Sequence, residues 1–187
     1  VCAFKPQIAY FASSGAEDQL KELIARIHSE YPEVPVILDA KRGDIGSTCE
    51  AYAQAYLGGI SIDGETTLSP FDCDCLTVNG YLGTDGITPF LNECEARDRG
   101  IYVLVKTSNK SSGEFQNKLM GDQPLYVRMA EKVAEWGEGL MTECGYSQVG
   151  AVVGATYPEE QKIIRQIIPH SYFLVPGYGA QGATAKD

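Results

Sequence analysis

The sequence contains 187 residues, of which 44% are hydrophobic and 21% are charged, a balance typical of a globular domain and not of a disordered chain. Its formal net charge of -10 argues against a surface that binds nucleic acid or anionic membranes, and its N-terminus lacks the pattern of a signal peptide. No apolar run reaches the roughly 18 residues of a membrane span, so we expect a cytoplasmic protein whose partner is a small metabolite.

Short apolar runs alternate with longer amphipathic segments along the whole chain. In chain order the runs, each as long as a strand, are VCAFK, VPVILDAK, DCLTVNGY, GIYVLVKTS, VGAVVGAT and SYFLVPGYG. Helices are predicted for Ala16 to Tyr31, Thr48 to Leu57, Ile87 to Arg99, Pro124 to Cys144 and Pro158 to Ile168. This alternation predicts a parallel α/β sheet covered by helices, either an open doubly wound sheet or a closed (β/α)8 barrel.

Two segments interrupt the alternation. Gly58 to Asp72 is an insertion with a predicted hairpin around Asp63-Gly64. Lys106 to Gln123 is a polar loop, longer than most connections between a strand and a helix, and loops of this length often act as lids. Neither segment has the composition of a linker, so we predict a single barrel domain over residues 1–187.

The cysteines carry no recognisable site. They form no CxxC pair and have no histidine partners at zinc-binding spacing. We therefore expect reduced and mostly buried thiols rather than disulfides. They are Cys2, Cys49, Cys73, Cys75, Cys94 and Cys144.

Polar residues gather where the predicted strands end, and this favours the barrel over the open sheet. An open sheet binds ligands mainly at one switch point, whereas a barrel draws site residues from many strands around a ring. The strand-end residues are Lys5, Asp39, Lys41, Asn79, Thr107, Ser108, Thr156 and Pro176 to Gln181.

The segment VILDAKRGDIGST places charges at the end of a strand. Asp39 and Lys41 are two residues apart, so both side chains lie on one face of the strand. Gly43 allows a turn that carries Asp44 back toward an ammonium, and Lys5 on the neighbouring strand supplies the fourth charge of a neutral set. Opposite charges keep each lysine protonated, which gives a proton donor inside a fixed field. The alternative is an ordinary salt bridge in which Asp44 caps the next helix.

The segment PGYGAQG, from Pro176 to Gly182, follows the last predicted strand. Its closely spaced glycines expose backbone N–H groups that can cradle a phosphate, with Gly179, Gln181 and Gly182 as the candidate contacts. The alternative is a plain glycine turn.

Six segments together resemble the orotidine 5'-phosphate decarboxylase family, in the family's order and over essentially the whole chain. They are FKPQIAYF, LDAKRGDIGST, VNGYLG, VLVKTSN, VGAVVGAT and VPGYGAQG. LDAKRGDIGST and VLVKTSN are similar to the longer bacterial branch. The resemblance implies a (β/α)8 barrel that works as a homodimer. It also implies a carboxy-lyase that converts orotidine 5'-phosphate to UMP in de novo pyrimidine biosynthesis, without metal or organic cofactor.

The resemblance also implies roles for individual residues. Lys5 and Asp39 flank the reaction centre, and Lys41 donates the proton to the carbon that loses CO2. The partner subunit's site is reached by Asp44, Ile45 and Thr48. The pyrimidine is bound by Ser108 with Pro176 nearby, and the phosphate is bound by Gln181.

Six strands cannot close an eight-stranded barrel, so we expect the first and last strands to lie outside this sequence. The resemblance implies that these strands carry an Asp for the ribose and an Arg for the phosphate. Two alternatives stay open at this point. One is a Mg²⁺-dependent sugar-phosphate decarboxylase or aldolase of the same suprafamily, which also uses a DxKxxD strand end. The other is a barrel that binds a phosphate ligand without turnover.

Overall fold

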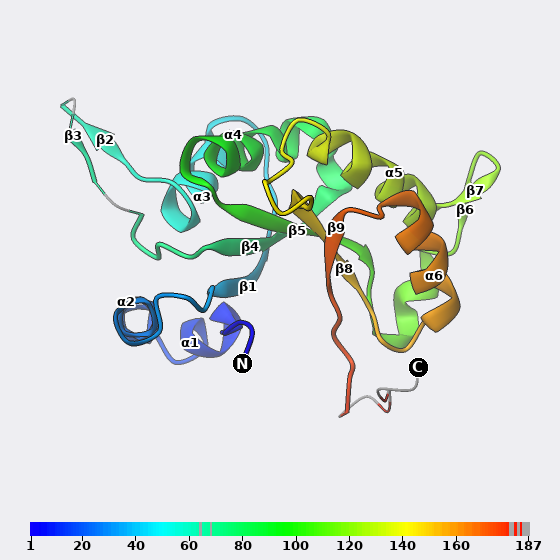
Figure 1. The fold of residues 1–187 in the computed structure, drawn as a ribbon, viewed down its shortest axis with the longest axis horizontal. Helices are drawn as coiled ribbons and strands as arrows, with labels where there is room; N and C mark the ends of the chain where they lie inside the picture. The colour runs from blue at the N-terminus through cyan, green and yellow to red at the C-terminus, as the bar shows by residue number, and fades with distance from the viewer. Residues whose placement is uncertain (64, 68, 180–181, 183, 185–187) are drawn as a thin grey trace. The chain divides into compact units, whose positions relative to one another are not determined.

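The computed structural model describes residues 1–63, 65–67, 69–179, 182 and 184. The chain forms two compact units, Val1–Ile101 and Tyr102–Asp187. Their helices and strands are drawn in Figure 1. Of the helices that the structure describes, none has the length and apolar character needed to cross a bilayer.

The first unit contains four helices among its described residues. They are α1 (Ile8–Ala12), α2 (Glu17–Glu30), α3 (Gly46–Tyr56) and α4 (Thr88–Arg97), with the short 3-10 turns η1 (Gly80–Leu82) and η2 (Thr84–Gly86) before α4. Helix α2 follows directly from its sequence, because Leu20, Ile24 and Ile27 recur at intervals of three and four residues and all three are buried. Helix α4 ends where Asp98 adopts a left-handed conformation, with φ of 53°.

The strands of the first unit bring the N-terminal segment beside the charged strand. β1 (Ile37–Arg42) pairs in parallel with β4 (Cys75–Val78). The first predicted strand is reduced to two parallel bridges, Phe4 to Val36 and Gln7 to Asp39, because α1 already begins at Ile8. The segment nevertheless runs along β1, so that Lys5 lies next to Asp39.

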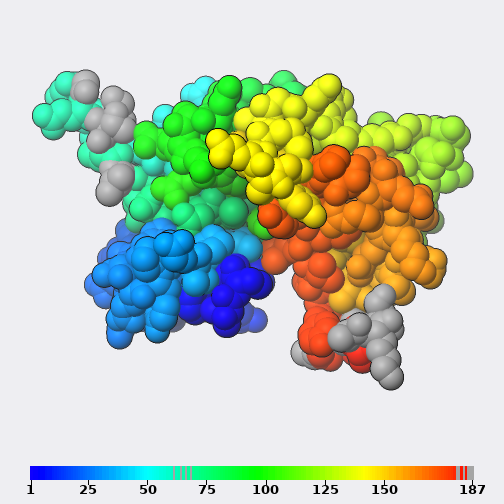
Figure 2. Space-filling view, viewed as in Figure 1, coloured from blue at the N-terminus to red at the C-terminus, as the bar shows by residue number. Residues whose placement is uncertain are grey.

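The insertion after α3 forms the predicted hairpin. β2 (Ser61–Ile62) and β3 (Glu65–Thr66) pair in antiparallel fashion, and Asp63 in the turn has a φ of 53°. In Figure 2 this hairpin stands out from the rest of its unit.

The second unit continues the alternation of strands and helices. Strand β5 (Gly100–Lys106) starts at the end of the first unit and continues into the second. After it come η3 (Lys110–Glu114), the hairpin β6 (Leu119–Met120) and β7 (Gln123–Pro124), α5 (Leu125–Gly137), β8 (Ser147–Val153), α6 (Pro158–Ile167) and β9 (Ser171–Leu174). In the sheet of this unit the strand order is β5-β8-β9. Strands β8 and β9 pair in parallel, and α5 packs on both β8 and α6.

One predicted helix is too long. The segment Pro124 to Cys144 was expected to be helical throughout, but α5 ends at Gly137. A Cβ on Gly137 would lie 2.5 Å from Ser147 Oγ, so the glycine allows β8 to approach closely. The remaining residues form a turn in which Gly145 has a φ of 80° and Met141 bridges to Ser147. The prediction overlooked that the glycines in this segment end the amphipathic stripe.

Strands β4 and β8 are buried along most of their length, as expected for parallel strands covered by helices. In the first unit Val36, Leu38, Leu76 and Val78 are all completely buried. Phe90 of α4 is also fully buried. Asp39 in β1 and Thr77 in β4 are the polar side chains buried within these two strands.

Candidate functional site

A carboxylate held between two ammonium groups lies at the carboxyl end of β1. Asp39 Oδ1 accepts a hydrogen bond from Lys41 Nζ at 2.5 Å, and Asp39 Oδ2 accepts one from Lys5 Nζ at 3.2 Å. The Asp39 side chain is 12% exposed, whereas the side chains of Lys5 and Lys41 are 40% and 46% exposed. The lysines therefore reach the carboxylate from the open side, where a ligand can also reach them.

The surroundings of Asp39 keep it ionised. Burial raises the pKa of its carboxyl, but the hydrogen bond and charge of Lys41, the charge of Lys5 and the hydroxyl of Thr77 outweigh burial, so that the pKa falls below its ordinary value. The resulting arrangement is a negative charge fixed between two positive ones.

Lys41 has an unusual backbone. Its φ is 48°, in the left-handed region that residues with side chains rarely adopt. Pairing between β1 and β4 shifts at the same place, since Leu38 pairs with Leu76 but Arg42 pairs with Val78. A bulge of this kind turns a side chain in a new direction, and here it lets Lys41 reach back to Asp39.

The sequence did not reveal Thr77, which stabilises this bulge. Its hydroxyl donates to Asp39 Oδ1 at 3.0 Å and accepts hydrogen bonds from the backbone N–H groups of Ala40 and Lys41, both at 2.9 Å. Thr77 lies inside an apolar strand, where a threonine is usually a packing residue. A polar side chain in an otherwise apolar run was the available signal.

Asp44 does not join the charged set within this chain. Among the described residues its carboxylate accepts from the N–H of Ile45 at 2.8 Å, and no ion pair with Lys5 or Lys41 is found. It does not cap α3 either, because the N-cap position is Ile45 and no side chain caps that helix. The side chains of Ile45 and Thr48 are exposed. The structure thus brings together Lys5, Asp39 and Lys41 and leaves the predicted fourth member apart.

The predicted residues of the second unit lie where β5, β8 and β9 end. The carbonyl of Ser108 accepts a hydrogen bond from Thr156 Oγ1 at 3.2 Å, and the carbonyl of Pro176 accepts one from the N–H of Ala155 at 2.8 Å. A Cβ on Gly154 would lie 2.8 Å from the backbone N of Ser108, so glycine is required for this approach. Ser108 and Pro176 are therefore linked through the residues that follow β8.

The glycine segment after β9 contains a turn. Gly179 and Gly182 have φ values of 78° and 95°, and the N–H of Gly182 donates to the carbonyl of Gly179 at 2.9 Å. Among the described residues, none would lie within 4 Å of a Cβ at either glycine. The predicted phosphate contact Gln181 lies outside the described residues. The role of this segment stays a prediction.

The long loop after β5 is organised by a buried lysine that sequence reasoning also missed. Lys106 is completely buried and donates to Ser112 Oγ at 3.0 Å and to Asn117 Oδ1 at 2.8 Å. Its ammonium lies 4.0 Å from the ring centroid of Tyr157. Two hydrogen bonds and this cation-π contact therefore fix the loop that begins beside Ser108 to the strand.

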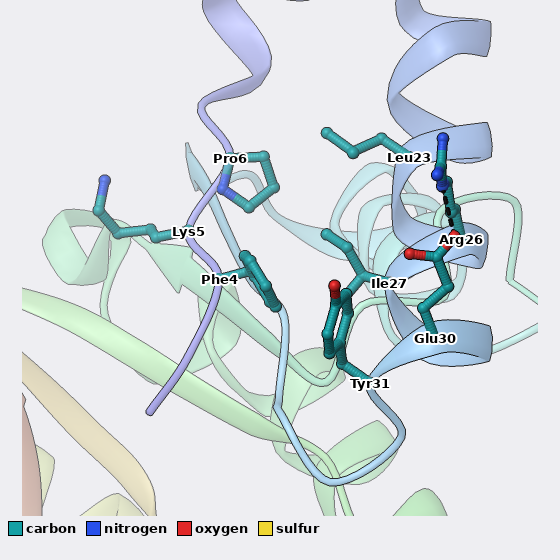
Figure 3. A pocket seen from close by; sticks show the side chains of 8 residues that line it. All are labelled: Phe4, Lys5, Pro6, Leu23, Arg26, Ile27, Glu30 and Tyr31. Carbon is teal, nitrogen blue, oxygen red and sulfur yellow. Dashed lines mark hydrogen bonds and ion pairs between the residues drawn. The ribbon is translucent and has the colours of Figure 1, made fainter. Parts of the chain in front are cut away.

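A pocket of about 420 Å³ lies between the N-terminal segment and α2, and Lys5 of the charged set is among its lining residues. Figure 3 shows Phe4 and Tyr31 facing one another in this pocket, while the ammonium of Lys5 points away from α2. The ring centroids of Phe4 and Tyr31 are 5.7 Å apart. Asp39 and Lys41 do not line this pocket, so we place the candidate site at the end of β1.

A search of the described residues for groups of three or more His, Cys, Asp or Glu side chains that could hold a metal ion finds none. The polar atoms of the charged set are instead two ammonium groups and one carboxylate, and ammonium groups repel cations. This donor set suits an anionic organic ligand.

Residues 1–187 match the sequence profile of the family described as "Orotidine 5'-phosphate decarboxylase / HUMPS family". A protein named orotidine 5'-phosphate decarboxylase from Caldicellulosiruptor bescii is 48% identical over 160 residues, which cover 86% of this chain and 52% of that protein. One from Rhodopirellula baltica is 46% identical over 185 residues, covering 98% of this chain and 59% of that protein. The chain thus spans between about half and three fifths of the length of these curated relatives.

Solved structures agree with the sequence relatives. A putative orotidine-monophosphate-decarboxylase from Toxoplasma gondii has a TM-score of 0.80 at 39% identity, covering 98% of this chain and 63% of that chain. A putative orotidine 5'-phosphate decarboxylase from Streptomyces avermitilis has a TM-score of 0.81 at 36% identity, covering 98% and 60%. These similarities confirm the predicted fold class, part of a (β/α)8 barrel.

Proposed function

Because this chain belongs to the orotidine 5'-phosphate decarboxylase / HUMPS family, we propose that the protein containing it is a carboxy-lyase that converts orotidine 5'-phosphate to UMP in de novo pyrimidine biosynthesis. The observation that carries the proposal is the ammonium of Lys41, held against Asp39 at 2.5 Å with Lys5 on the other carboxylate oxygen.

Lys41 is the proposed proton donor. When the bond between the pyrimidine ring and the carboxylate breaks, CO2 leaves and the electron pair stays on a ring carbon. An ammonium fixed at that carbon is more favourable in the transition state than in the substrate, and interactions of this kind accelerate the chemical step. Lys41 then transfers a proton to the carbon and recovers one from solvent. The left-handed backbone of Lys41 supports this role, because it directs the side chain toward Asp39.

Asp39 and Lys5 have supporting roles in this proposal. Asp39 stays ionised between the lysines and so fixes the position of the Lys41 ammonium. A carboxylate beside the departing carboxylate also raises the energy of the bound substrate, although this effect is secondary to transition-state stabilisation. Lys5 weakens the repulsion between Asp39 and the substrate carboxylate, because its ammonium donates a hydrogen bond to Asp39 and partly neutralises its negative charge.

We propose a homodimer with shared sites, because the charged set of one chain has one positive charge in excess. Two ammonium groups surround one carboxylate, and Asp44 of the same chain makes no ion pair with them among the described residues. In this proposal Asp44, Ile45 and Thr48 reach the site of a second copy, whose Asp44 in turn restores neutrality.

Exposed apolar side chains next to Asp44 support that contact. Ile45 is 55% exposed, and in the turn after β4 Tyr81 is 80% and Leu82 is 48% exposed. This turn packs against Asp44, since a Cβ on Gly86 would lie 3.0 Å from the Asp44 carbonyl oxygen. Large exposed apolar side chains that gather on one part of a surface are typical of a contact with another chain.

The remaining roles rest on the family resemblance. We propose that Ser108 and Pro176 bind the pyrimidine, and that Gly179, Gln181 and Gly182 bind the phosphate, without a metal or organic cofactor. We also propose one barrel domain and a cytoplasmic location. The location is supported by the six cysteines, which are all free thiols, as is usual in a reducing compartment.

The proposal is tested by measuring CO2 release from carboxyl-labelled orotidine 5'-phosphate in EDTA, with the protein that contains this chain. The Lys41→Ala variant, expressed and purified in the same way, is the control for contaminating decarboxylase activity. Release by the wild type and none by the variant supports the proposal. Activity that requires Mg²⁺ would indicate the sugar-phosphate enzyme, and binding without turnover would indicate a non-catalytic barrel. Either result would overturn the proposed function.

A further inference from the structure

The hydroxyl of Thr77 is fully used in holding the charged set. Thr77 is 1% exposed and lies on β4 beside the charged end of β1. A hydroxyl group has one proton to donate and two lone pairs that accept. Thr77 donates to Asp39 Oδ1 at 3.0 Å and accepts from Ala40 N–H and Lys41 N–H at 2.9 Å each. It therefore contacts three consecutive residues of β1.

The bulge in β1 makes these contacts necessary. Strand pairing passes from Leu38 and Leu76 to Arg42 and Val78, so residues 39–41 of β1 lie opposite the single residue Thr77 of β4. In a regular strand successive N–H groups point to opposite sides. At this bulge two successive N–H groups, those of Ala40 and Lys41, donate to the same oxygen. A buried N–H group without an acceptor is unfavourable, and the Thr77 hydroxyl supplies the acceptor for both.

We propose that Thr77 is a positioning residue for the reaction, which fixes the carboxylate of Asp39 and the backbone of Lys41 so that the Lys41 ammonium is held at the reacting carbon. This inference rests on the proposed function, since it assigns the proton transfer to Lys41. Thr77 itself is buried beneath the pair and acts only through Asp39 and Lys41.

Two conservative substitutions of Thr77 separate the effect of its hydroxyl from the effect of its size and shape. Thr77→Val keeps the size but removes the donor and both acceptors, whereas Thr77→Ser keeps the hydroxyl. The chain also offers a matched control in Ser69, which is 5% exposed, accepts from the N–H groups of Phe71 and Asp72 and donates to the carbonyl of Ala55. Its hydroxyl has the same bonding pattern but lies away from the lysines.

The expected kinetic result is a loss in kcat rather than in KM. A displacement of about 1 Å can cost on the order of 100-fold in rate, so we expect Thr77→Val to lower kcat at least about 30-fold, with KM within about threefold. Thr77→Ser should restore kcat, and Ser69→Ala should lower the melting temperature without changing kcat. The Thr77 hydroxyl also lowers the pKa of Asp39, together with Lys41 and Lys5. Its removal should therefore move the acid limb of the kcat/KM profile to higher pH.

A crystal structure of Thr77→Val separates this inference from the proposed function. We expect Lys41 to leave the left-handed region, or its Nζ to move away from Asp39, whether or not the protein decarboxylates orotidine 5'-phosphate. If Thr77→Val does not fold, Thr77→Ala takes its place in both experiments. The inference is overturned if kcat stays within about threefold of wild type, if Ser fails to restore activity, or if Lys41 keeps its position.

Discussion

Mutation of two carboxylates, Asp39 and Asp74, should have opposite effects on activity and stability. The comparison tests whether the catalytic site lies at the Asp39 end of the strands. Asp39 lies in β1 and contacts two half-exposed lysines. Asp74 directly precedes β4 and accepts hydrogen bonds from Val36 N–H at 2.8 Å, His28 Nε2 at 2.9 Å and Arg99 Nη1 at 2.8 Å. We expect Asp39→Asn to abolish activity with little loss of stability. Asp74→Ala should lower stability and leave the activity of the folded protein unchanged.

The magnitudes follow from burial. Asp74→Ala leaves the N–H of the fully buried Val36 without its acceptor, which costs about 1–3 kcal/mol, and removes a charged hydrogen bond to Arg99 worth about 1.5–3 kcal/mol before solvent screening. Because the Asp74 side chain is 31% exposed, we expect a total near 3 kcal/mol. The two ion pairs lost in Asp39→Asn involve exposed lysines and should cost only about 1 kcal/mol together.

These values predict different melting curves. For a protein of this size about 1 kcal/mol corresponds to roughly 2–4 °C in Tm, so Asp74→Ala should melt about 6–12 °C lower and Asp39→Asn only a few degrees lower. At a temperature where both variants are folded, Asp39→Asn should lose at least about 100-fold in kcat, whereas Asp74→Ala should retain wild-type kcat per folded molecule. Equal shifts in Tm for the two variants, or a kcat for Asp39→Asn near that of the wild type, would refute this reasoning.

Further predictions concern single residues of the proposed site and one thiol. Lys41→Ala should abolish decarboxylation while UMP binding stays measurable by calorimetry, and a variant that keeps about a tenth of wild-type turnover would exclude Lys41 as the proton donor. Mixing inactive Asp44→Ala subunits with inactive Lys41→Ala subunits should restore part of the activity, because one site of the mixed dimer then contains both Lys41 and Asp44. If activity does not recover after subunit exchange has been verified, the two subunits do not share a site. Gly179→Val should weaken the binding of UMP far more than that of uridine, and equal weakening would show that this segment is only a turn. Hydrogen bonding from Thr142 lowers the pKa of the Cys144 thiol. The rate of Cys144 alkylation should therefore reach half its maximum at a lower pH than for an ordinary thiol, and Thr142→Val should raise that midpoint pH. A midpoint that Thr142→Val leaves unchanged argues against the assigned hydrogen bond.

The sequence predicted most of the fold because its strands and helices are specified locally. Alternation of buried apolar runs with amphipathic stripes places α2 within one residue of its predicted ends, and Asp63-Gly64 marks the hairpin between β2 and β3. Where several weak signals compete, as in the segment after Gly137, the prediction extended a helix too far. The bulge at Lys41 depends on a hydroxyl 36 residues away in the sequence, and no periodicity reports such a contact.

The sequence predicted which ionic groups meet Asp39, but it did not predict the net charge of the site. Lys41 lies beside Asp39 as predicted, although a bulge and not regular strand spacing brings it there, and strand adjacency placed Lys5 on the other side. Neutrality was expected from four residues of one chain, whereas the described contacts leave Asp44 bonded to the N–H of Ile45. Sequence spacing shows that a carboxylate is available but not which copy of the chain uses it. The mixed-subunit experiment tests this directly.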